Sequence, residues 1–204
     1  LKKAHVPVPR RFKKASEIDA PVLVKSFGAA GGHGYFFAKN KKEFRQKIKN
    51  FKSKNYIIQE YVIGVSAYIH YFYSPLTKKL ELLGTDTRRQ PNIEGLTKIP
   101  QIYQRVLEKV AIKYEEAGHI AVTVLESLLE LAFELAERFV AASKQLIPPG
   151  VIGPFALQTI ITPGPPKKEI IVIDVSPRMP GSPGIIATPY SQYLYGKSIS
   201  VGRR

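Results

Sequence analysis

The chain has 204 residues, of which 44% are hydrophobic and 23% charged. This balance is typical of a folded globular protein and excludes a disordered or collagen-like chain. The longest apolar stretch, residues 125–140, contains four glutamates and an arginine, which excludes a membrane-spanning helix. Cysteine is absent, so disulfides and thiolate chemistry are excluded, and a cytoplasmic location is expected. The sequence begins at Leu1 and is expected to be a piece of a longer protein.

The charge is strongly basic, with 31 Lys and Arg against 16 acidic residues and a formal net charge of +15. Such an excess attracts phosphate-bearing partners, whether nucleic acids or nucleotides. Tyr68, Tyr71 and Tyr73 could stack on bases, but their alternation in an apolar segment is better explained by the two faces of a sheet. No nucleic-acid-binding module is recognised, so nucleic acid is the least favoured partner.

The first part of the chain predicts a small unit of sheet and helix. After the basic approach segment 1–11, strands are expected at 21–25 and 35–38, joined by a glycine-rich hairpin loop. An amphipathic helix is expected over 41–51, because its apolar residues recur at helical spacing, and a strand follows at 56–62. This order of elements predicts a compact unit that ends near residue 62.

The remainder predicts long strands and two helices. Alternating apolar residues indicate an antiparallel hairpin of two strands, and a polar loop follows. Apolar periodicity then indicates two helices, and two further apolar strands precede a tail rich in Pro and Gly from residue 177. The expected ranges are 65–73 and 80–86 for the hairpin, 87–100 for the loop, 101–114 and 128–142 for the helices, and 155–161 and 169–175 for the last strands.

Two segments have the chemistry of nucleotide binding. Four glycines follow Lys25 within residues 28–34, and glycines let backbone amides close around phosphate oxygens while lysine supplies a positive charge. The alternative is an ordinary hairpin turn. Residues 59–62 lie at the exit of a predicted strand, where an extended hinge can bind the edge of a purine ring, or where the strand simply ends.

Two further sets of side chains are candidates. Gln158 and Asp174 lie on the last two predicted strands and can aim two oxygen ligands at one cation, or they satisfy hydrogen bonds inside the sheet. Among the histidines, His70 is expected to be packed on a strand. His33 and His119 lie in predicted loops, where a contact to a phosphate or a base is plausible.

Five segments together resemble a known family. In this order and spacing they resemble the archaeal formate-dependent ATP-grasp enzymes that synthesise formaminoimidazole-carboxamide ribonucleotide in IMP biosynthesis, and the resemblance runs nearly from end to end. The segments are 25–36, 56–64, 70–75, 153–159 and 189–196.

The resemblance implies an α+β protein with the ATP-grasp fold. Its two subdomains would be residues 1–62 and 63–204, with ATP held between their sheets, and the family's N-terminal domain would precede Leu1. The implied cofactors are ATP and Mg²⁺, the implied substrates are formate and aminoimidazole-carboxamide ribonucleotide, and a homo-oligomer is expected.

The family also implies a role for each matching residue. Lys25 and Arg178 would neutralise the phosphoryl group during transfer. His119 stands where the family has an asparagine that touches the ribonucleotide, and Gln158 and Asp174 stand at two magnesium positions that are usually acids. The residues implied to bind ATP are Lys25, Gly28, Gly31, Gly32, His33, Gly34, Gln59, Glu60, Tyr61 and Val62.

The implied activity is that of a ligase that forms a carbon–nitrogen bond. ATP would phosphorylate formate, and the amine of the ribonucleotide would attack the resulting formyl phosphate. The alternative is an ATP-binding paralogue with another carboxylate substrate or with a non-catalytic nucleotide-binding role. Gln158 and His119, which depart from the family pattern, favour this alternative.

Overall fold

The computed structural model describes residues 1–28, 34–90, 95, 98–103, 117–164, 166–178 and 196–197. Packing divides the chain into two compact units. The large unit comprises Leu1–Val8, Ile63–Thr87 and His119–Arg204, and the small unit comprises Pro9–Val62 and Arg88–Gly118. One break between the units falls after residue 62, where a boundary was expected, whereas residues 1–8 and 88–118 group with the other unit than the expected division gives. The assignment of 1–62 and 63–204 to two ATP-grasp subdomains stays a prediction.

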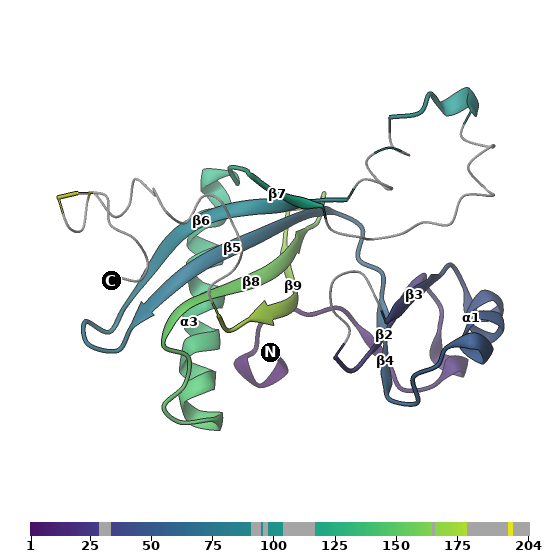
Figure 1. The fold of residues 1–204 in the computed structure, drawn as a ribbon, viewed down its shortest axis with the longest axis horizontal. Coiled ribbons are helices and arrows are strands. Elements are labelled where there is room, and N and C mark those ends of the chain that lie inside the picture. Colours follow the sequence, from purple (N-terminus) through teal and green to yellow (C-terminus); the bar gives the residue numbers. More distant parts are fainter. Residues whose placement is uncertain are drawn as a thin grey trace. The chain divides into compact units, whose positions relative to one another are not determined.

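The small unit contains an antiparallel sheet in the order β1-β4-β2-β3. Helix α1 covers one face of it, begins at the cap residue Asn40, whose side chain accepts a hydrogen bond from the Glu43 N–H, and continues into the short helix η3 (Figure 1). The predicted strands and helix are confirmed, whereas β1 was not predicted. The elements are β1 (Arg11–Phe12), η2 (Ala15–Glu17), β2 (Val22–Ser26), β3 (Tyr35–Ala38), α1 (Lys41–Lys47), η3 (Ile48–Asn50) and β4 (Tyr56–Glu60).

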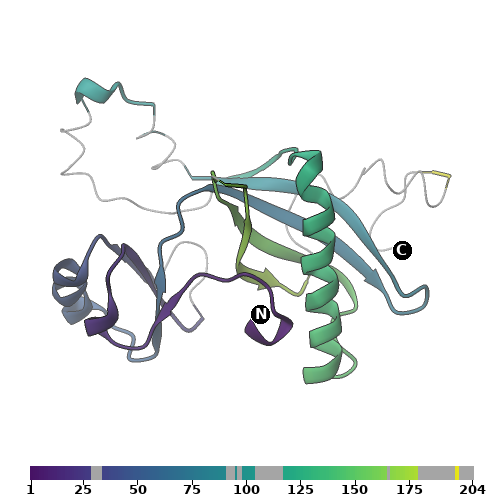
Figure 2. The same cartoon turned by 180° about the vertical axis from the view of Figure 1, so that it is seen from behind.

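The large unit contains a five-stranded sheet in the order β7-β6-β5-β8-β9, and helix α3 lies across one of its faces (Figures 1 and 2). Its strands are β5 (Val65–Ser74), β6 (Lys79–Arg89), β7 (Gly118–Ala121), β8 (Gly153–Ile161) and β9 (Ile170–Ser176), and its helices are η1 (Lys2–Ala4), η5 (Glu126–Leu128) and α3 (Leu129–Leu146). No helix within the described ranges is long and apolar enough to cross a membrane.

The predictions for the large unit are mostly confirmed. Strand β6 continues to Arg89, so the loop expected from residue 87 begins later than predicted, and the edge strand β7 was not predicted. The helix expected over 101–114 lies mostly outside the described residues.

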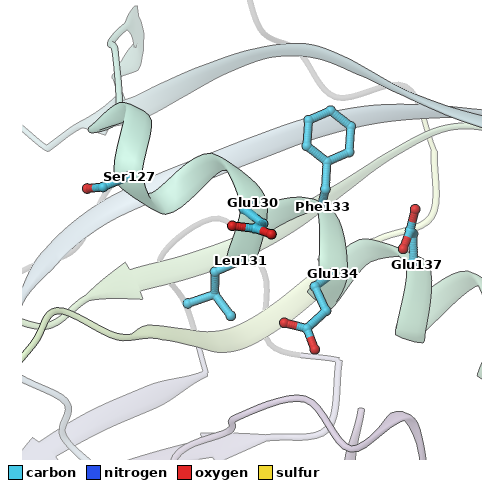
Figure 3. Close-up of a pocket in the computed structure, with 6 residues that line it drawn as sticks. All are labelled: Ser127, Glu130, Leu131, Phe133, Glu134 and Glu137. Carbon is cyan, nitrogen blue, oxygen red and sulfur yellow. The ribbon is translucent and has the colours of Figure 1, made fainter.

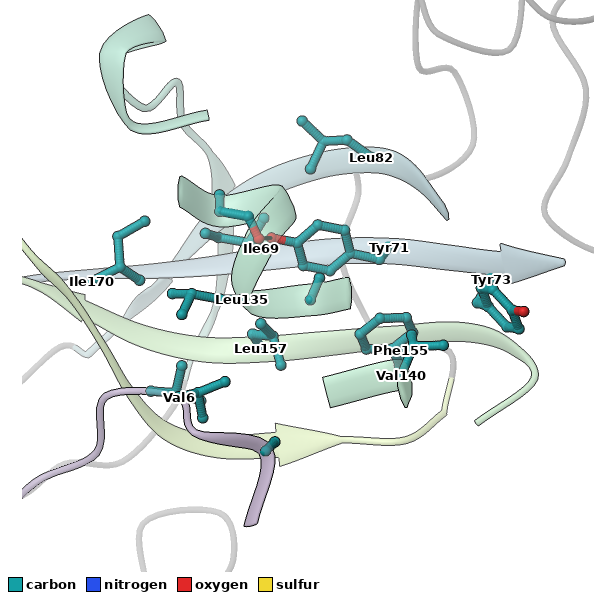
Figure 4. Packing of buried hydrophobic residues seen from close by; sticks show 14 of the residues in the cluster. Val6, Ile69, Tyr71, Tyr73, Leu82, Leu135, Val140, Phe155, Leu157 and Ile170 are labelled. Atoms are coloured by element: carbon teal, nitrogen blue, oxygen red, sulfur yellow. Dashed lines mark hydrogen bonds between the residues drawn. The ribbon is translucent and has the colours of Figure 1, made fainter. Parts of the chain in front are cut away.

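Aliphatic and aromatic side chains together fill the core between this sheet and α3 (Figure 4). Tyr71 and Phe155 are opposite each other on β5 and β8, are fully buried, and stack with their ring centroids 5.3 Å apart. Tyr68 and Tyr73 are also buried. Because all three tyrosines of β5 are inside the protein, they are sheet residues, as predicted, and offer no surface for stacking on bases.

The first eight residues pack against the same core. Ala4 and Val6 are buried among its residues, and the Val172 N–H donates to the Pro7 carbonyl over 2.8 Å. The Arg138 guanidinium on α3 donates to the His5 carbonyl. This segment is therefore part of the large unit as well as a basic approach to the first predicted strand.

Replacement of Tyr71 with phenylalanine tests this core. The Tyr71 hydroxyl donates to the Ala132 carbonyl over 2.8 Å, so its loss should cost about 1 kcal/mol at neutral pH. Burial raises the pKa of Tyr71. The folded protein therefore keeps a proton that the unfolded chain loses above about pH 10, so stability falls as the pH rises further. In urea unfolding, the free energy of unfolding of the wild type should exceed that of Tyr71→Phe at neutral pH, and this difference should shrink as the pH rises above about 10. Tyr103→Phe, at an exposed ring, should leave the free energy of unfolding unchanged.

Candidate active site

The glycine loop leaves the small sheet from two paired strands. Lys25 on β2 is opposite Tyr35 on β3, and the N–H and hydroxyl of Ser26 both donate to the Gly34 carbonyl, over 2.8 and 2.9 Å. Gly28 and Gly34 have φ values of 78° and 79°, a conformation that favours glycine. The predicted glycine hairpin is confirmed at both of its ends. Gly31, Gly32 and His33 lie outside the described residues.

Lys25 shares a face of the sheet with Gln59. Val22 and Val24 are fully buried in the core beneath α1, so the alternate residues Leu23 and Lys25 lie on the other face. Leu23 is directly opposite Gln59 on β4, which puts that glutamine on the face of Lys25. The candidate phosphate and purine residues are therefore brought to one side of the small unit.

The predicted hinge, residues 59–62, includes the end of β4 and is hydrogen-bonded within the small unit. The Glu60 N–H donates to the Arg10 carbonyl over 2.8 Å, and the Tyr61 N–H donates to the Pro21 carbonyl over 2.9 Å. The Tyr61 ring contacts Phe37 edge-on, with centroids 5.0 Å apart. These contacts fix the strand end from which Val62 leads out of the small unit.

A β-bulge in β6 turns an aspartate away from α3. Tyr71 is opposite Leu82, but the next pair along the strands is shifted, so Leu83 is an extra residue. Asp86 consequently pairs with Tyr68, on the face that α3 does not cover. In a regular ladder Asp86 would follow Leu82 onto the face beneath α3.

A second bulge, in β9, does the same for Asp174. Thr159 is opposite Val172, yet Gln158 is opposite Asp174, which makes Ile173 the extra residue. Val172 is buried in the core beneath α3. Without the bulge, Asp174 would follow Val172 into that core; with it, Asp174 shares the other face with Gln158.

Together the two bulges produce a row of polar side chains across four neighbouring strands. The members of this cross-strand row are directly opposite one another in the ladders of β6, β5, β8 and β9, and they are Asp86, Tyr68, Gln158 and Asp174. Bulges are frequent beside active sites, where they re-aim a side chain. Each of the two carboxylates of the row, Asp86 and Asp174, is oriented by a bulge in its own strand.

Gln158 and Asp174 fit a magnesium ion that is also bound to phosphates. The Gln158 Nε2 donates to Ser176 Oγ over 2.9 Å, so the amide oxygen Oε1 of Gln158 can face a cation. Asp174 Oδ1 accepts from the Val175 N–H, so the other carboxylate oxygen, Oδ2, can face the same cation. Magnesium takes oxygen ligands and usually keeps several from waters or substrate phosphates. No cluster of three or more His, Cys, Asp or Glu suited to a metal occurs in the part of the chain that the structure describes. Arg178 is exposed just after β9.

His119 lies in strand β7 and not in a loop as expected, because β7 adds an edge to the sheet beside β6. Its Nδ1 is 3.3 Å from Asp86 Oδ2, and the His70 Nε2 is 2.8 Å from the same oxygen. His70 is buried, as expected. Asp86 was not among the candidates from sequence. The one feature of the sequence that could have indicated Asp86 is its acidic side chain within a predicted strand.

A pocket on α3 does not compete with this site. Three of the side chains around it are glutamates, and negative charge repels phosphate (Figure 3). It lies on the helix, whereas the cross-strand row faces away from α3. The lining residues are Ser127, Glu130, Leu131, Phe133, Glu134 and Glu137.

Solved structures with the same arrangement of strands and helices define the class of fold. An IMP biosynthesis protein PurP from Thermococcus kodakaraensis matches with a TM-score of 0.66 and 24% identity, covering 100% of this chain and 59% of that one. The biotin carboxylase domain of 2-oxoglutarate carboxylase from Hydrogenobacter thermophilus, in complex with MgADP, ADP and bicarbonate, matches with a TM-score of 0.63 and 17% identity, covering 97% and 41%. The chain is an α+β protein with the ATP-grasp fold, as expected.

The chain belongs to the family described as "Domain of unknown function (DUF1297)", whose model matches residues 36–204. A relative from Methanocaldococcus jannaschii is 38% identical over 215 residues and is named 5-formaminoimidazole-4-carboxamide-1-(beta)-D-ribofuranosyl 5'-monophosphate synthetase. The match covers 100% of this chain and 58% of that protein. The resemblance drawn from the five segments is thereby confirmed, and the chain spans somewhat more than half the length of this relative.

Proposed function

We propose that this chain is the ATP-grasp part of a ligase that formylates aminoimidazole-carboxamide ribonucleotide in purine biosynthesis. The observation that carries the proposal is the 38% identity, along the whole chain, to a synthetase named for the formylated product. The cross-strand row supports it, because the two bulges bring both carboxylates to one face. Such a face can hold a cation, and a cation supplies the charge neutralisation that phosphoryl transfer needs.

In this proposal the small unit binds ATP. Lys25 and the glycine loop contact the phosphates, because a lysine and backbone N–H groups are the usual donors to them. The adenine edge meets the hinge, residues 59–62. Its Glu60 and Tyr61 N–H groups are already bonded within the unit, so the purine would have to meet other backbone groups of this segment.

Gln158 and Asp174 would hold Mg²⁺, which would supply charge neutralisation on the ATP phosphates when bound. Since the pair offers one amide oxygen and one carboxylate, the phosphates themselves must provide further ligands. Lys25 and Arg178 would each contribute a positive charge to phosphoryl transfer.

The proposed chemistry has two steps. A formate oxygen attacks the terminal phosphorus of ATP, and the bond from that phosphorus to ADP breaks, which gives formyl phosphate. The substrate amine then attacks the formyl carbon, a C–N bond forms, and phosphate leaves with the electron pair of the C–O bond. Positioning of the reactants in line is the main contribution that the protein must make.

The test is an ADP-release assay on the full-length protein with formate and the aminoimidazole ribonucleotide, each omitted in turn. We expect full release only with both. The second candidate is a paralogue that uses another carboxylate, which the amide of Gln158 at a usually acidic position favours. Formate-independent release that another small carboxylate stimulates would support this paralogue and contradict the first proposal.

The metal pair gives a direct prediction. Gln158→Glu should strengthen Mg²⁺ binding to the ATP-saturated protein, because it adds a charged oxygen, and Asp174→Asn should weaken it, each by about 5- to 10-fold, the effect of about 1 kcal/mol. Calorimetric titration of Mg²⁺ measures both. The matched control is Ser176→Ala, which removes the hydrogen-bond partner of Gln158 without touching a ligand oxygen. Equal affinities in wild type and both metal-pair variants would reject the metal role.

A further inference from the structure

Asp86 is a buried carboxylate held between two imidazoles. Its side chain is 0% exposed on β6, and its Oδ2 atom lies 2.8 Å from His70 Nε2 on β5 and 3.3 Å from His119 Nδ1 on β7. Burial of a carboxylate is costly unless charged or hydrogen-bonding groups compensate it. The aspartate and the two histidines therefore form one cluster across three neighbouring strands, in which His70 hydrogen-bonds to the carboxylate and His119 Nδ1 lies close to it without a hydrogen bond.

The two histidines differ in their access to other molecules. The His70 side chain is 2% exposed, and within the described ranges its Nδ1 has no hydrogen-bond partner. The His119 side chain is 22% exposed. Because Asp86 faces its Nδ1, the remaining nitrogen, Nε2, is the one available to a ligand. Only His119 can exchange a proton with a bound molecule.

The carboxylate also selects the form of the His119 ring. A carboxylate accepts hydrogen bonds, so it favours the tautomer with the proton on Nδ1, which leaves a lone pair on Nε2. Among the described residues His119 Nδ1 has no hydrogen-bond partner, and its 3.3 Å contact with Asp86 Oδ2 is not aligned as a hydrogen bond. Catalytic hydrogen bonds are often poorly aligned before substrate binds.

We propose that His119 is the general base of the amine-transfer step, with Asp86 and His70 as positioning residues. The inference rests on the proposed function. As the amine nitrogen bonds to the formyl carbon and phosphate leaves, the proton of the resulting cationic nitrogen passes to His119 Nε2, and the imidazolium later releases it to water. His70 Nε2–H holds the carboxylate, and the carboxylate holds His119 in the tautomer that accepts the proton.

The placement of Asp86 supports this role. The bulge in β6 removes the aspartate from the face beneath α3 and puts it in the cross-strand row with Gln158 and Asp174. The proton acceptor and the proposed metal pair therefore belong to one face of one sheet, within the large unit.

The first test does not depend on activity. The chain has four histidines, so their side-chain signals in ¹H–¹⁵N correlation spectra can be assigned by single replacements. We expect His119 in the Nδ1–H form and His70 in the Nε2–H form. Asp86→Asn should return His119 to exchange between tautomers, while His5→Asn should remove one signal and change no other. A wild-type His119 in the Nε2–H form, or in free exchange, would overturn the proposal.

The second test separates the two chemical steps. Hydroxylamine traps formyl phosphate directly, so formylhydroxamate reports the first step without the ribonucleotide. His119→Gln should leave this step within about twofold and lower kcat for the ribonucleotide about 10²- to 10⁴-fold with little change in KM. Added imidazole should restore part of the rate in His119→Ala. His119→Gln keeps the Asp86–His70 contact, so it is the variant least exposed to a folding defect.

The outcomes of the two tests distinguish the inference from the proposed function. Equal loss of both steps, or no loss of either, would overturn the role of His119 while the ligase assignment stands. A wild type that forms no formylhydroxamate from ATP and formate would contradict the proposed function. The tautomer spectra would then still decide whether Asp86 positions His119.

Discussion

Replacement of Phe155 with alanine should lower the free energy of unfolding of the large unit by about 3–5 kcal/mol. The Phe155 side chain is 0% exposed, and its ring stacks on Tyr71 and contacts Phe139 at a centroid distance of 5.5 Å. Deletion of the ring removes buried apolar surface and leaves a cavity that a sheet packed against a helix can fill only partly.

Urea unfolding followed by circular dichroism and tyrosine fluorescence measures this loss, since the chain has no tryptophan. The matched control is Leu76→Ala in the turn between β5 and β6, where the side chain is 92% exposed and the change should stay below about 0.5 kcal/mol. A loss of less than about 1 kcal/mol in Phe155→Ala would mean that Phe155 is not central to this core.

Replacement of Lys25 with alanine should weaken ATP binding about 10- to 100-fold. A hydrogen bond between a charged donor and phosphate contributes about 1.5–3 kcal/mol, which corresponds to this change in Kd. Calorimetry gives the affinity directly. The rise in melting temperature on addition of ATP should shrink in parallel, because a ligand stabilises the native state according to its affinity.

The control for Lys25→Ala is Lys49→Ala, which removes the same charge from the exposed short helix η3 of the same unit. It should leave ATP affinity within about twofold, since exposed charges at a distance are screened by salt. An equal effect of both variants would show that only the net charge of the small unit matters. An unchanged affinity in Lys25→Ala would contradict the phosphate role.

The alternation of apolar residues was sufficient to predict most strands, but not the faces of their polar residues. Gln158 and Asp174 were correctly placed on neighbouring strands. Simple alternation from Val172, however, would bury Asp174 beneath α3, and from Leu82 it would do the same to Asp86. One inserted residue in each strand reverses the outcome. A bulge depends on tertiary packing and leaves no regular pattern in a single sequence.

The short edge strands escaped prediction for a related reason. β1 has two residues and β7 has four, Gly118–Ala121, too few to show a period. Since β7 carries His119, the contact of that histidine with Asp86 was also hidden. The five-segment resemblance, which needs no periodicity, was sufficient for the fold and for the family.

The hydrogen bond from the Val172 N–H to the Pro7 carbonyl has a consequence for the order in which a nascent chain can fold. The four-stranded sheet of the small unit is complete once Glu60 has left the ribosome. The first eight residues, by contrast, must wait for β9, because their partners α3 and Val172 lie far later in the chain. We therefore expect the four-stranded sheet of the small unit to fold first, while Ala4 and Val6 stay exposed to chaperones until the rest of the large unit has been synthesised.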